Sequence, residues 1–267
     1  IELIVWWLDT KNKIIIIKKE KYMRKNLVLL SFSAVFALNM SADTLGFEAG
    51  AAVWGAKTSG TFEYKGDSID LAKDLGYGDL NTNFIWASFE HSLPFIPNIK
   101  IQHTKIEDSS SKTSSITFDN IIYSGTISSS LQLNQTDFNL YYELLDNWVN
   151  LDFGINGKYI DGSVSASDNS GTTSASTKDL SYVIPIVYAK AKFDLPLSGL
   201  SVETDVSYIT YADSDFYDVK GGILYETSFG LGGTVGYRAE KIKLDDVSDA
   251  YSDIEIKGAY AGLYYHF

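Results

Sequence analysis

The sequence predicts an all-β fold, a closed antiparallel transmembrane β-barrel of about ten strands, with eight strands as the rival count. Three observations lead to this prediction. Apolar and polar residues alternate along many segments, no segment has the ~18 uninterrupted apolar residues of a transmembrane helix, and short connections alternate with longer polar ones. In the stretch VNLDFGINGKY, Leu151 and Phe153 fall on one face of a strand, and Asp152 and Lys158 fall on the other.

Ten segments show this alternation and are predicted to be the barrel strands. They cover residues 45–59, 82–92, 98–107, 132–145, 148–161, 181–195, 199–212, 215–229, 231–244 and 254–267. The connections LPFIPN, LLDNW, LPLSG and FGLGG are short, whereas YKGDSIDLAKDLGYGDLN, EDSSSKTSSITFDNIIYSGTISSS and SVSASDNSGTTSASTK are longer and polar. Short periplasmic turns and longer extracellular loops are typical of outer-membrane barrels, and an even count places both termini at the short-turn end.

Strand 98–107 fits the pattern poorly, because His103 and Lys105 share a face with Ile99 and Ile101. Either polar residues face lipid on this strand, or the bilayer begins low on it. The sequence leaves both alternatives open.

In the last predicted strand, the apolar residues of the first half and of the second half fall on opposite faces. Ile254 and Ile256 do not share a face with the apolar residues between Ala259 and Phe267. We expect a β-bulge at Gly258, which would bring the two isoleucines onto the lipid face.

The first 42 residues differ from the rest of the chain. Met23, Arg24 and Lys25 precede the apolar run LVLLSFSAVFAL, and small residues up to Ala42 offer a cleavage site. This pattern predicts a removable secretory signal over residues 23–42. Residues 1–22 are interpreted as non-native upstream translation, and residues 43–267 as a single barrel domain.

Composition excludes several classes of site and partner. The chain has no cysteine, so it contains neither a disulfide framework nor a thiolate metal site. Residues 1–42 hold 7 of the 22 basic and 3 of the 34 acidic residues, so residues 43–267 have a net charge of -16. A strongly acidic exported chain repels nucleic acid and is better suited to cations.

The polar faces of the predicted strands carry both acids and bases. If the apolar faces touch lipid, these charges line the lumen, where they are expected to pair across strands. The predicted lumen-facing charged residues are Glu48, Glu90, Glu143, Asp152, Lys158, Lys190, Lys192, Glu203, Asp205, Lys220, Glu226, Arg238 and Glu240. A barrel of about ten strands is expected to have a narrow or plugged lumen.

The C-terminal stretch AYAGLYYHF supports the lipid-facing interpretation. Leu263 and Tyr265 share a face with the terminal Phe267. This pattern resembles the C-terminal signature by which bacterial outer-membrane proteins are recognised for barrel insertion. The predicted location is therefore the bacterial outer membrane, and the predicted partners are the barrel-assembly machinery, outer-membrane lipid and lipopolysaccharide.

Two stretches point to a family. IDLAKDLGYGDL (69–80), followed by WASFEHSLPFIPNIKIQHT (86–104), resembles a family of small bacterial outer-membrane β-barrel proteins of uncharacterised function. The family pattern is a glutamate-histidine pair, a proline-containing turn and an outgoing amphipathic strand, carried here by Glu90, His91, Pro94, Pro97 and Asn98. The resemblance implies a fold and a compartment and does not imply an activity.

The sequence offers little for catalysis. His91 and His266 are expected at the periplasmic rim, and His103 lies near Glu107 and Asp108 as the only conceivable acid-base pair. The protein is therefore expected not to be an enzyme and to need no cofactor. A lipid- or peptide-hydrolysing barrel enzyme, with His103 at its centre, is the alternative.

The predicted outer loops are rich in aspartate. Asp67, Asp70 and Asp74 lie in one loop, and Asp245, Asp246 and Asp249 in another, so divalent cations are possible partners. A solvated acidic rim explains the same residues. The stretch SIDLAKDLGY has helical spacing and is expected to form a short lid or plug.

The sequence therefore predicts a non-enzymatic outer-membrane barrel with a structural or narrow-pore role. A channel for a defined small solute is the alternative from another functional class.

Overall fold

The computed structural model describes residues 45–267 except residues 94, 169–175, 180 and 248. The predicted signal segment and residues 1–22 lie outside the described residues. The described part of the chain forms strands and turns, and it contains no helix that is long and apolar enough to cross a membrane.

Thirteen strands follow one another along the described part of the chain. They are β1 (Leu45–Tyr64), β2 (Ile69–Asp70), β3 (Asp79–His91), β4 (Asn98–Lys105), β5 (Glu107–Phe118), β6 (Ile121–Leu145), β7 (Val149–Asp168), β8 (Ser176–Asp179), β9 (Tyr182–Leu195), β10 (Leu200–Tyr211), β11 (Ser214–Glu226), β12 (Leu231–Val247) and β13 (Ala250–His266).

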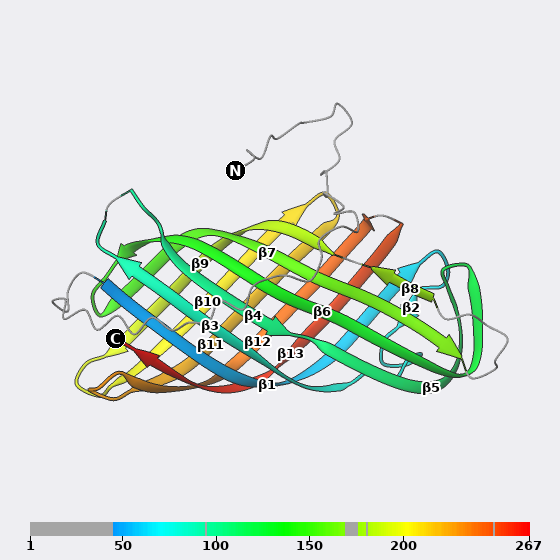
Figure 1. The fold of residues 1–267 in the computed structure, drawn as a ribbon, viewed down its shortest axis with the longest axis horizontal. Coiled ribbons are helices and arrows are strands. Elements are labelled where there is room, and N and C mark those ends of the chain that lie inside the picture. Colours follow the sequence, from blue (N-terminus) through cyan, green and yellow to red (C-terminus); the bar gives the residue numbers. More distant parts are fainter. Residues whose placement is uncertain (1–44, 94, 169–175, 180, 248) are drawn as a thin grey trace, which may run out of the picture.

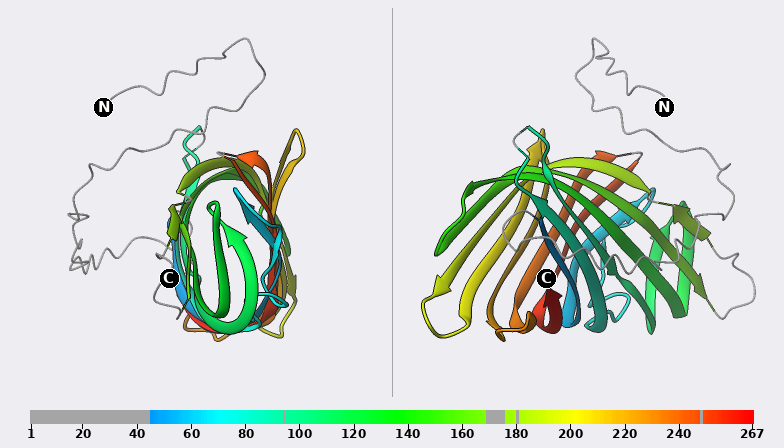
Figure 2. Two further views of the ribbon diagram at one scale, coloured as in Figure 1. Left: turned by 90° about the vertical axis from the view of Figure 1, so that its right-hand side faces the viewer. Right: turned by 60° about the vertical axis from the view of Figure 1, so that its left-hand side comes forward.

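The strands close into a ring, because the first strand pairs with the last (Figures 1 and 2). In β1, Ala51 lies opposite Ile85 of β3 on one side and opposite Leu263 of β13 on the other. All pairs are antiparallel, and ten strands form the barrel while β2, β5 and β8 lie outside it. The prediction of a closed barrel of ten strands is confirmed, and the rival count of eight is wrong.

The polar stretch that follows β4, residues 107–130, was predicted to be a loop, but it forms a long hairpin of β5 and the first part of β6. In β5 and β6, Ser111 lies opposite Ser128, and Thr113 lies opposite Thr126. Serine and threonine alternate there with buried apolar residues such as Ile127, which is 0% exposed. The hairpin continues the barrel beyond the ring at the end remote from the C-terminus (Figure 1).

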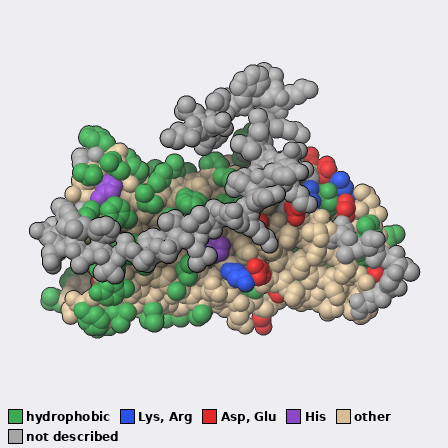
Figure 3. All heavy atoms as spheres, viewed as in Figure 1, with side chains coloured by type: hydrophobic (Ala, Val, Ile, Leu, Met, Phe, Trp, Pro, Cys, Tyr) green, Lys and Arg blue, Asp and Glu red, His purple; other side chains and the backbone are tan. Residues whose placement is uncertain are grey.

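The outward-facing side chains divide the barrel into two sections along its axis. The lower, membrane section has an apolar exterior. Ten of its outward residues are between 49% and 67% exposed: Val53, Ile85, Phe138, Phe153, Ile155, Val183, Val202, Ile223, Val235 and Leu263. Apolar side chains gather over the end of the barrel that carries the C-terminus (Figure 3). A ring of strands with such a belt spans a bilayer.

The upper section, which we call the crown, comprises the described residues of 57–83, 103–136, 161–181 and 241–257. Most of its outward positions are polar, and they include Lys57, Asn81, Lys105, Glu107, Asn134, Asp161, Lys241, Asp253 and Lys257. Its inward positions are apolar and buried, and include Phe62, Phe118, Leu131, Leu133, Ile242 and Ile254. The polarity of the wall is therefore inverted between the two sections, as expected if the crown stands in water.

The inversion settles both strands that fitted the pattern poorly. On β4, Ile99 and Ile101 lie in the apolar belt, while His103 and Lys105 lie above it. On β13, the bulge expected at Gly258 is absent from the register, and that prediction is wrong. Ile254 and Ile256 face inward, 3% and 1% exposed, because this part of β13 lines the apolar core of the crown.

The stretch SIDLAKDLGY closes part of the crown without forming a helix. It contains β2 and a turn, so the helical prediction is wrong. Leu71, Leu75 and Tyr77 are 1%, 3% and 4% exposed. Burial raises the pKa of Tyr77 to about 12, because the phenolate would have to form away from water.

Substitution by arginine on the outer face of β6 is expected to lower stability much more in the membrane section than in the crown. Phe138 and Gln132 both face outward, in the membrane section and in the crown respectively. Phe138→Arg places a charge in the apolar belt and is expected to destabilise the barrel by ~2–4 kcal/mol if that position lies near the bilayer midplane. Gln132→Arg is expected to change stability little. Urea unfolding of both variants in lipid vesicles measures the difference, and equal effects would contradict the two-section description.

Candidate functional site

The inward side chains of the membrane section form a layer of paired charges across the lumen. Arg238 of β12 lies at its centre and is fully buried. Its guanidinium donates to Asp218 at 2.9 and 2.7 Å and to the hydroxyl of Thr104 at 2.9 Å. The guanidinium carbon lies 4.7 Å from the ring centre of Trp54. Such fork-like contacts hold a buried cation in one orientation.

Lys158 of β7 occupies the same layer and is also fully buried. Its ammonium lies 2.9 Å from Asp137 and 3.6 Å from Asp218, and it donates to the side-chain oxygen of Gln135 at 2.6 Å. Gln135 donates in turn to Glu240. Acids and bases thus alternate across neighbouring strands, as the sequence predicted for this face.

A second group centres on the carboxylate of Asp205 in β10. Lys100 and Lys220 lie 2.9 and 2.8 Å from it, and the hydroxyl of Tyr188 donates to it at 3.2 Å. These groups come from four strands, β4, β9, β10 and β11. A lone buried carboxylate would carry a large desolvation cost, and the two ammonium groups offset it.

The remaining predicted lumen residues lie towards the periplasmic end. Lys190 lies 3.9 Å from Asp152 and 3.5 Å from Glu203. Glu48 accepts from the indole of Trp86, and Glu90 accepts from the hydroxyl of Tyr141, both at 2.7 Å. Lys192 pairs with Asp194, Glu226 lies near His266, and Glu143 is exposed at the rim.

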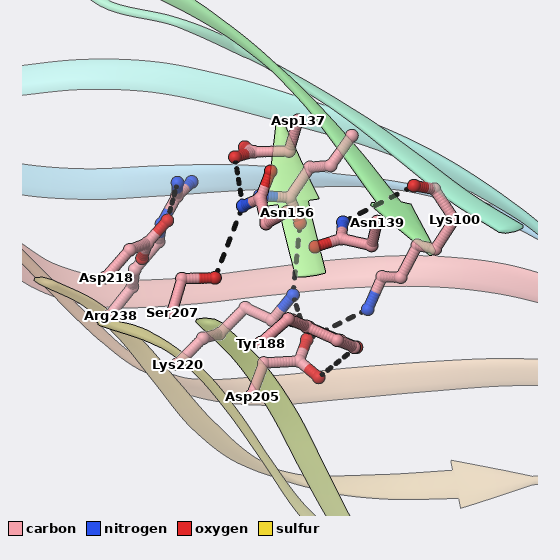
Figure 4. A pocket seen from close by; sticks show the side chains of 11 residues that line it. Lys100, Asp137, Asn139, Asn156, Tyr188, Asp205, Ser207, Asp218, Lys220 and Arg238 are labelled. Atoms are coloured by element: carbon pink, nitrogen blue, oxygen red, sulfur yellow. Dashed lines mark hydrogen bonds and ion pairs between the residues drawn. The ribbon is translucent and has the colours of Figure 1, made fainter. Parts of the chain in front are cut away.

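A small polar cavity lies inside this layer (Figure 4). Its volume is about 20 Å³, enough for about one water molecule. The lining residues are Lys100, Gln102, Asp137, Asn139, Asn156, Tyr188, Asp205, Ser207, Asp218, Lys220 and Arg238. The side-chain oxygens of Asn139 and Asn156 are buried and have no hydrogen-bond partner among the described residues. A water held between protein groups would satisfy them.

Sequence reasoning omitted several members of this layer. Asp137 and Asp218 have the same parity on their strands as Glu143 and Lys220, so the alternation alone was enough to include them. The uncharged residue Gln135 gives no signal as a bridge between Lys158 and Glu240, because only the closed ring brings those strands into reach.

The predicted cation-binding aspartates mostly contact the backbone or a lysine. Asp67 accepts from the amide of Thr117 at 2.7 Å, and Asp70 accepts from the amide of Lys73 at 2.8 Å, which lowers the pKa of Asp70. Asp74 accepts from the amide of Asp70 at 2.8 Å, and Asp249 lies 3.8 Å from Lys65. Asp245 and Asp246 lie near the tip of β12. Within the described ranges, no group of three or more carboxylate or histidine side chains has metal-binding geometry.

The histidines lie outside the layer around Arg238, and His266 lies 3.5 Å from Glu226 at the periplasmic end. His103 faces outward and lies 3.0 Å from the hydroxyl of Thr136. Glu107, expected near His103, is held by Lys105 at 2.8 Å and by Asn134 at 3.0 Å. The side chain of His91 contacts the amide of Leu93 at the turn after β3.

The residues of the C-terminal pattern project outward from the end of the chain. Leu263, Tyr265 and Phe267 are 67%, 43% and 65% exposed. The amide of Phe267 donates to the carbonyl of Phe47 at 2.9 Å, so the last residue is joined to the first strand.

No family model and no curated protein matches the chain. Among solved structures, the chain is similar to the outer membrane protease OmpT of Escherichia coli, with 14% identity, coverage of 88% of this chain and 100% of that one, and a TM-score of 0.46. It is also similar to Ail, the attachment invasion locus protein of Yersinia pestis, with 10% identity, coverage of 83% and 99%, and a TM-score of 0.38. The translocator domain of the autotransporter NalP from Neisseria meningitidis is similar as well, with 14% identity, coverage of 86% of this chain and 91% of that one, and a TM-score of 0.40. Similarity at this level concerns the barrel fold and carries nothing about activity.

The fold determines the compartment. A closed barrel with an even number of antiparallel strands, short turns at one end and an outward apolar belt is the architecture of bacterial outer-membrane proteins, and the protein lies in that membrane.

The charged layer makes a specific stability prediction on β12. Arg238→Met leaves Asp218 and Glu240 without their guanidinium and is expected to destabilise the barrel by ~3–5 kcal/mol. The matched change Lys241→Met breaks an outward pair with Asp253 at 2.9 Å and is expected to lose less than about 1 kcal/mol. Urea titration of both variants in the same detergent gives the comparison. A loss below about 1 kcal/mol for Arg238→Met would show that this layer is not a stabilising element.

Proposed function

We propose that the protein is a closed, non-enzymatic outer-membrane barrel with a structural role, which holds a rigid crown above the bilayer. The observation that carries this proposal is the paired layer around Arg238, in which the central cavity has a volume of only about 20 Å³. Barrels of 16–18 strands leave an aqueous channel, whereas the interior of a barrel of about eight strands is filled by side chains.

The interior of the crown is a second, independent argument for a closed lumen. Above the charged layer, the interior is filled by buried apolar side chains such as Phe62, Leu131 and Ile254. An ion that left the charged layer would meet this apolar core and lose its hydration there. Two successive barriers of opposite chemistry therefore oppose conduction.

The absence of enzymatic activity is also part of the proposal. A hydroxyl nucleophile needs a base that a third group orients. His103 contacts Thr136 on the exterior, and the nearby Glu107 is engaged by Lys105 and Asn134. This arrangement favours a polar surface contact at the edge of the belt.

The proposed partners follow from the surfaces. The apolar belt would contact outer-membrane lipid, and the polar outer wall of the crown would lie among lipopolysaccharide head groups, with divalent cations between the acidic residues and phosphate. The outward C-terminal residues Leu263, Tyr265 and Phe267 would be read by the barrel-assembly machinery.

Planar-bilayer recording tests the closed lumen. The purified barrel is expected to give no reproducible unitary current, because the paired charges and the apolar core fill the lumen between the described strands. A large porin inserted under the same conditions is the positive control for insertion. Reproducible unitary currents from the protein would overturn the structural proposal and favour the narrow channel for a small solute, for which the polar cavity around Asp205 would be the selective part.

A further inference from the structure

The wall of the barrel has a seam between β9 and β10. Pairing of these strands ends at Val187 opposite Tyr208. β9 nevertheless continues to Tyr182 in register with β7, and β10 continues to Tyr211 in register with β11. Among the described residues, 183–186 of β9 pair only with β7, and 209–211 of β10 pair only with β11.

The sequence of β9 fits an unpaired edge. Pro185 lies within the seam and has no N–H to donate. Proline is tolerated in a strand mainly along a free edge, because elsewhere it removes a ladder hydrogen bond. The hairpin of β10 and β11 is also short, since β11 begins at Ser214 while the adjacent β12 runs on to Val247. The wall is therefore lowest beside the seam.

An apolar cavity lies on the inner side of the β9 edge of the seam. Its volume is about 20 Å³, and its walls include Leu133, Ile160, Ile184, Ile242 and Ile254. Ile184 belongs to the unpaired part of β9, so the seam and the cavity share a wall. The cavity is distinct from the polar cavity of the charged layer, with which it shares no lining residue.

The outer side of the seam faces the upper edge of the lipid belt. Val183 is 67% exposed and lies opposite Tyr159, and the next outward residue on β7 is Asp161. On β10, the outward residue likewise changes from Tyr208 to the polar Thr210 at the upper edge of the lipid belt. An amphiphile with its head group at this level would have its hydrocarbon chain beside the unpaired edges of β9 and β10.

We propose that the seam and the apolar cavity form a binding site for one hydrocarbon chain of a single-chain amphiphile from the outer leaflet. The chain enters sideways between β9 and β10, and its terminal one or two carbons occupy the cavity between Leu133 and Ile242. The walls offer almost no polar group, so an apolar chain is the ligand class that fits. Each buried methylene contributes ~0.8 kcal/mol of transfer free energy, which favours a chain over a compact polar solute.

Photolabelling with dodecanoic acid that carries a terminal diazirine tests this site in lipid vesicles. The full-length folded barrel is irradiated, and the modified residues are mapped by mass spectrometry. The expected result is label on the inward residues Leu133, Ile160 or Ile242, in addition to label on lipid-facing residues. Label confined to outward residues would overturn the proposal.

The absence of cysteine allows the seam to be closed chemically. Pro185→Cys together with Thr210→Cys places two thiols on opposite sides of the seam, and a short bifunctional maleimide joins them even where their separation exceeds disulfide reach. The matched control, Ala189→Cys with Val206→Cys, joins positions that are already paired in the wall. The unheated band on an electrophoresis gel reports folding of both.

Cross-linking across the seam is expected to reduce the labelling of the inward residues at least tenfold, while the labelling of Val183 persists. Cross-linking of the control pair is expected to change neither. Inward label that survives cross-linking would overturn the sideways entry and assign the chain to the aqueous end of the crown. Ile184→Trp, which fills the cavity from β9, is a second variant. It is expected to abolish inward label without cross-linking, and unchanged inward label in this variant would also overturn the proposal.

Discussion

Charged side chains inside a ring whose outer surface faces hydrocarbon can be retained only if they are paired. This constraint organises the membrane section, where Arg238, Lys158 and Lys100 each lie within 3 Å of a carboxylate on another strand. Lys158 and Arg238 pair with carboxylates on the adjoining strands β6 and β11. Lys100 with Asp205, and Lys158 with Asp218, pair across the lumen, and these two pairs exist only in the closed ring. The layer therefore links the ring across its interior and at the same time fills the lumen, so one interaction accounts for both the closure and the small cavity.

The inversion of polarity at the upper edge of the belt is the second organising feature. The same strands that carry charge inside and apolar residues outside reverse this assignment over a few residues, as on β7 between Lys158 and Ile160 inside and between Tyr159 and Asp161 outside. Below this edge the outer face of the barrel contacts lipid, and above it the outer face contacts water. The crown consequently has an ordinary apolar core, and the β9–β10 seam lies where the two kinds of interior meet.

Alternation alone predicted the ten barrel strands, and it predicted them because a strand half covered by lipid has period two throughout. It failed where the medium changes: the expected bulge at Gly258 assumed that Ile254 must face lipid, whereas this isoleucine faces the crown core. The Ser- and Thr-rich hairpin of β5 and β6 has the sequence of a loop, since its outward residues are those of turns. The pairing of Gln135 with Glu240, and the seam, depend on ring geometry and register that no local pattern carries.

The central claim is that the outer face of the barrel contacts lipid in the membrane section and water in the crown. Its most direct test is a single-cysteine accessibility scan along the outer face of β7, in a chain that has no cysteine of its own. Cysteine is placed in turn at Phe153, Ile155, Tyr159, Asp161, Ser163 and Ser165 of the folded barrel in vesicles, and labelling by a membrane-impermeant maleimide is measured. The account predicts little labelling up to Tyr159 and rapid labelling from Asp161 onward. Uniform labelling along the strand would contradict it.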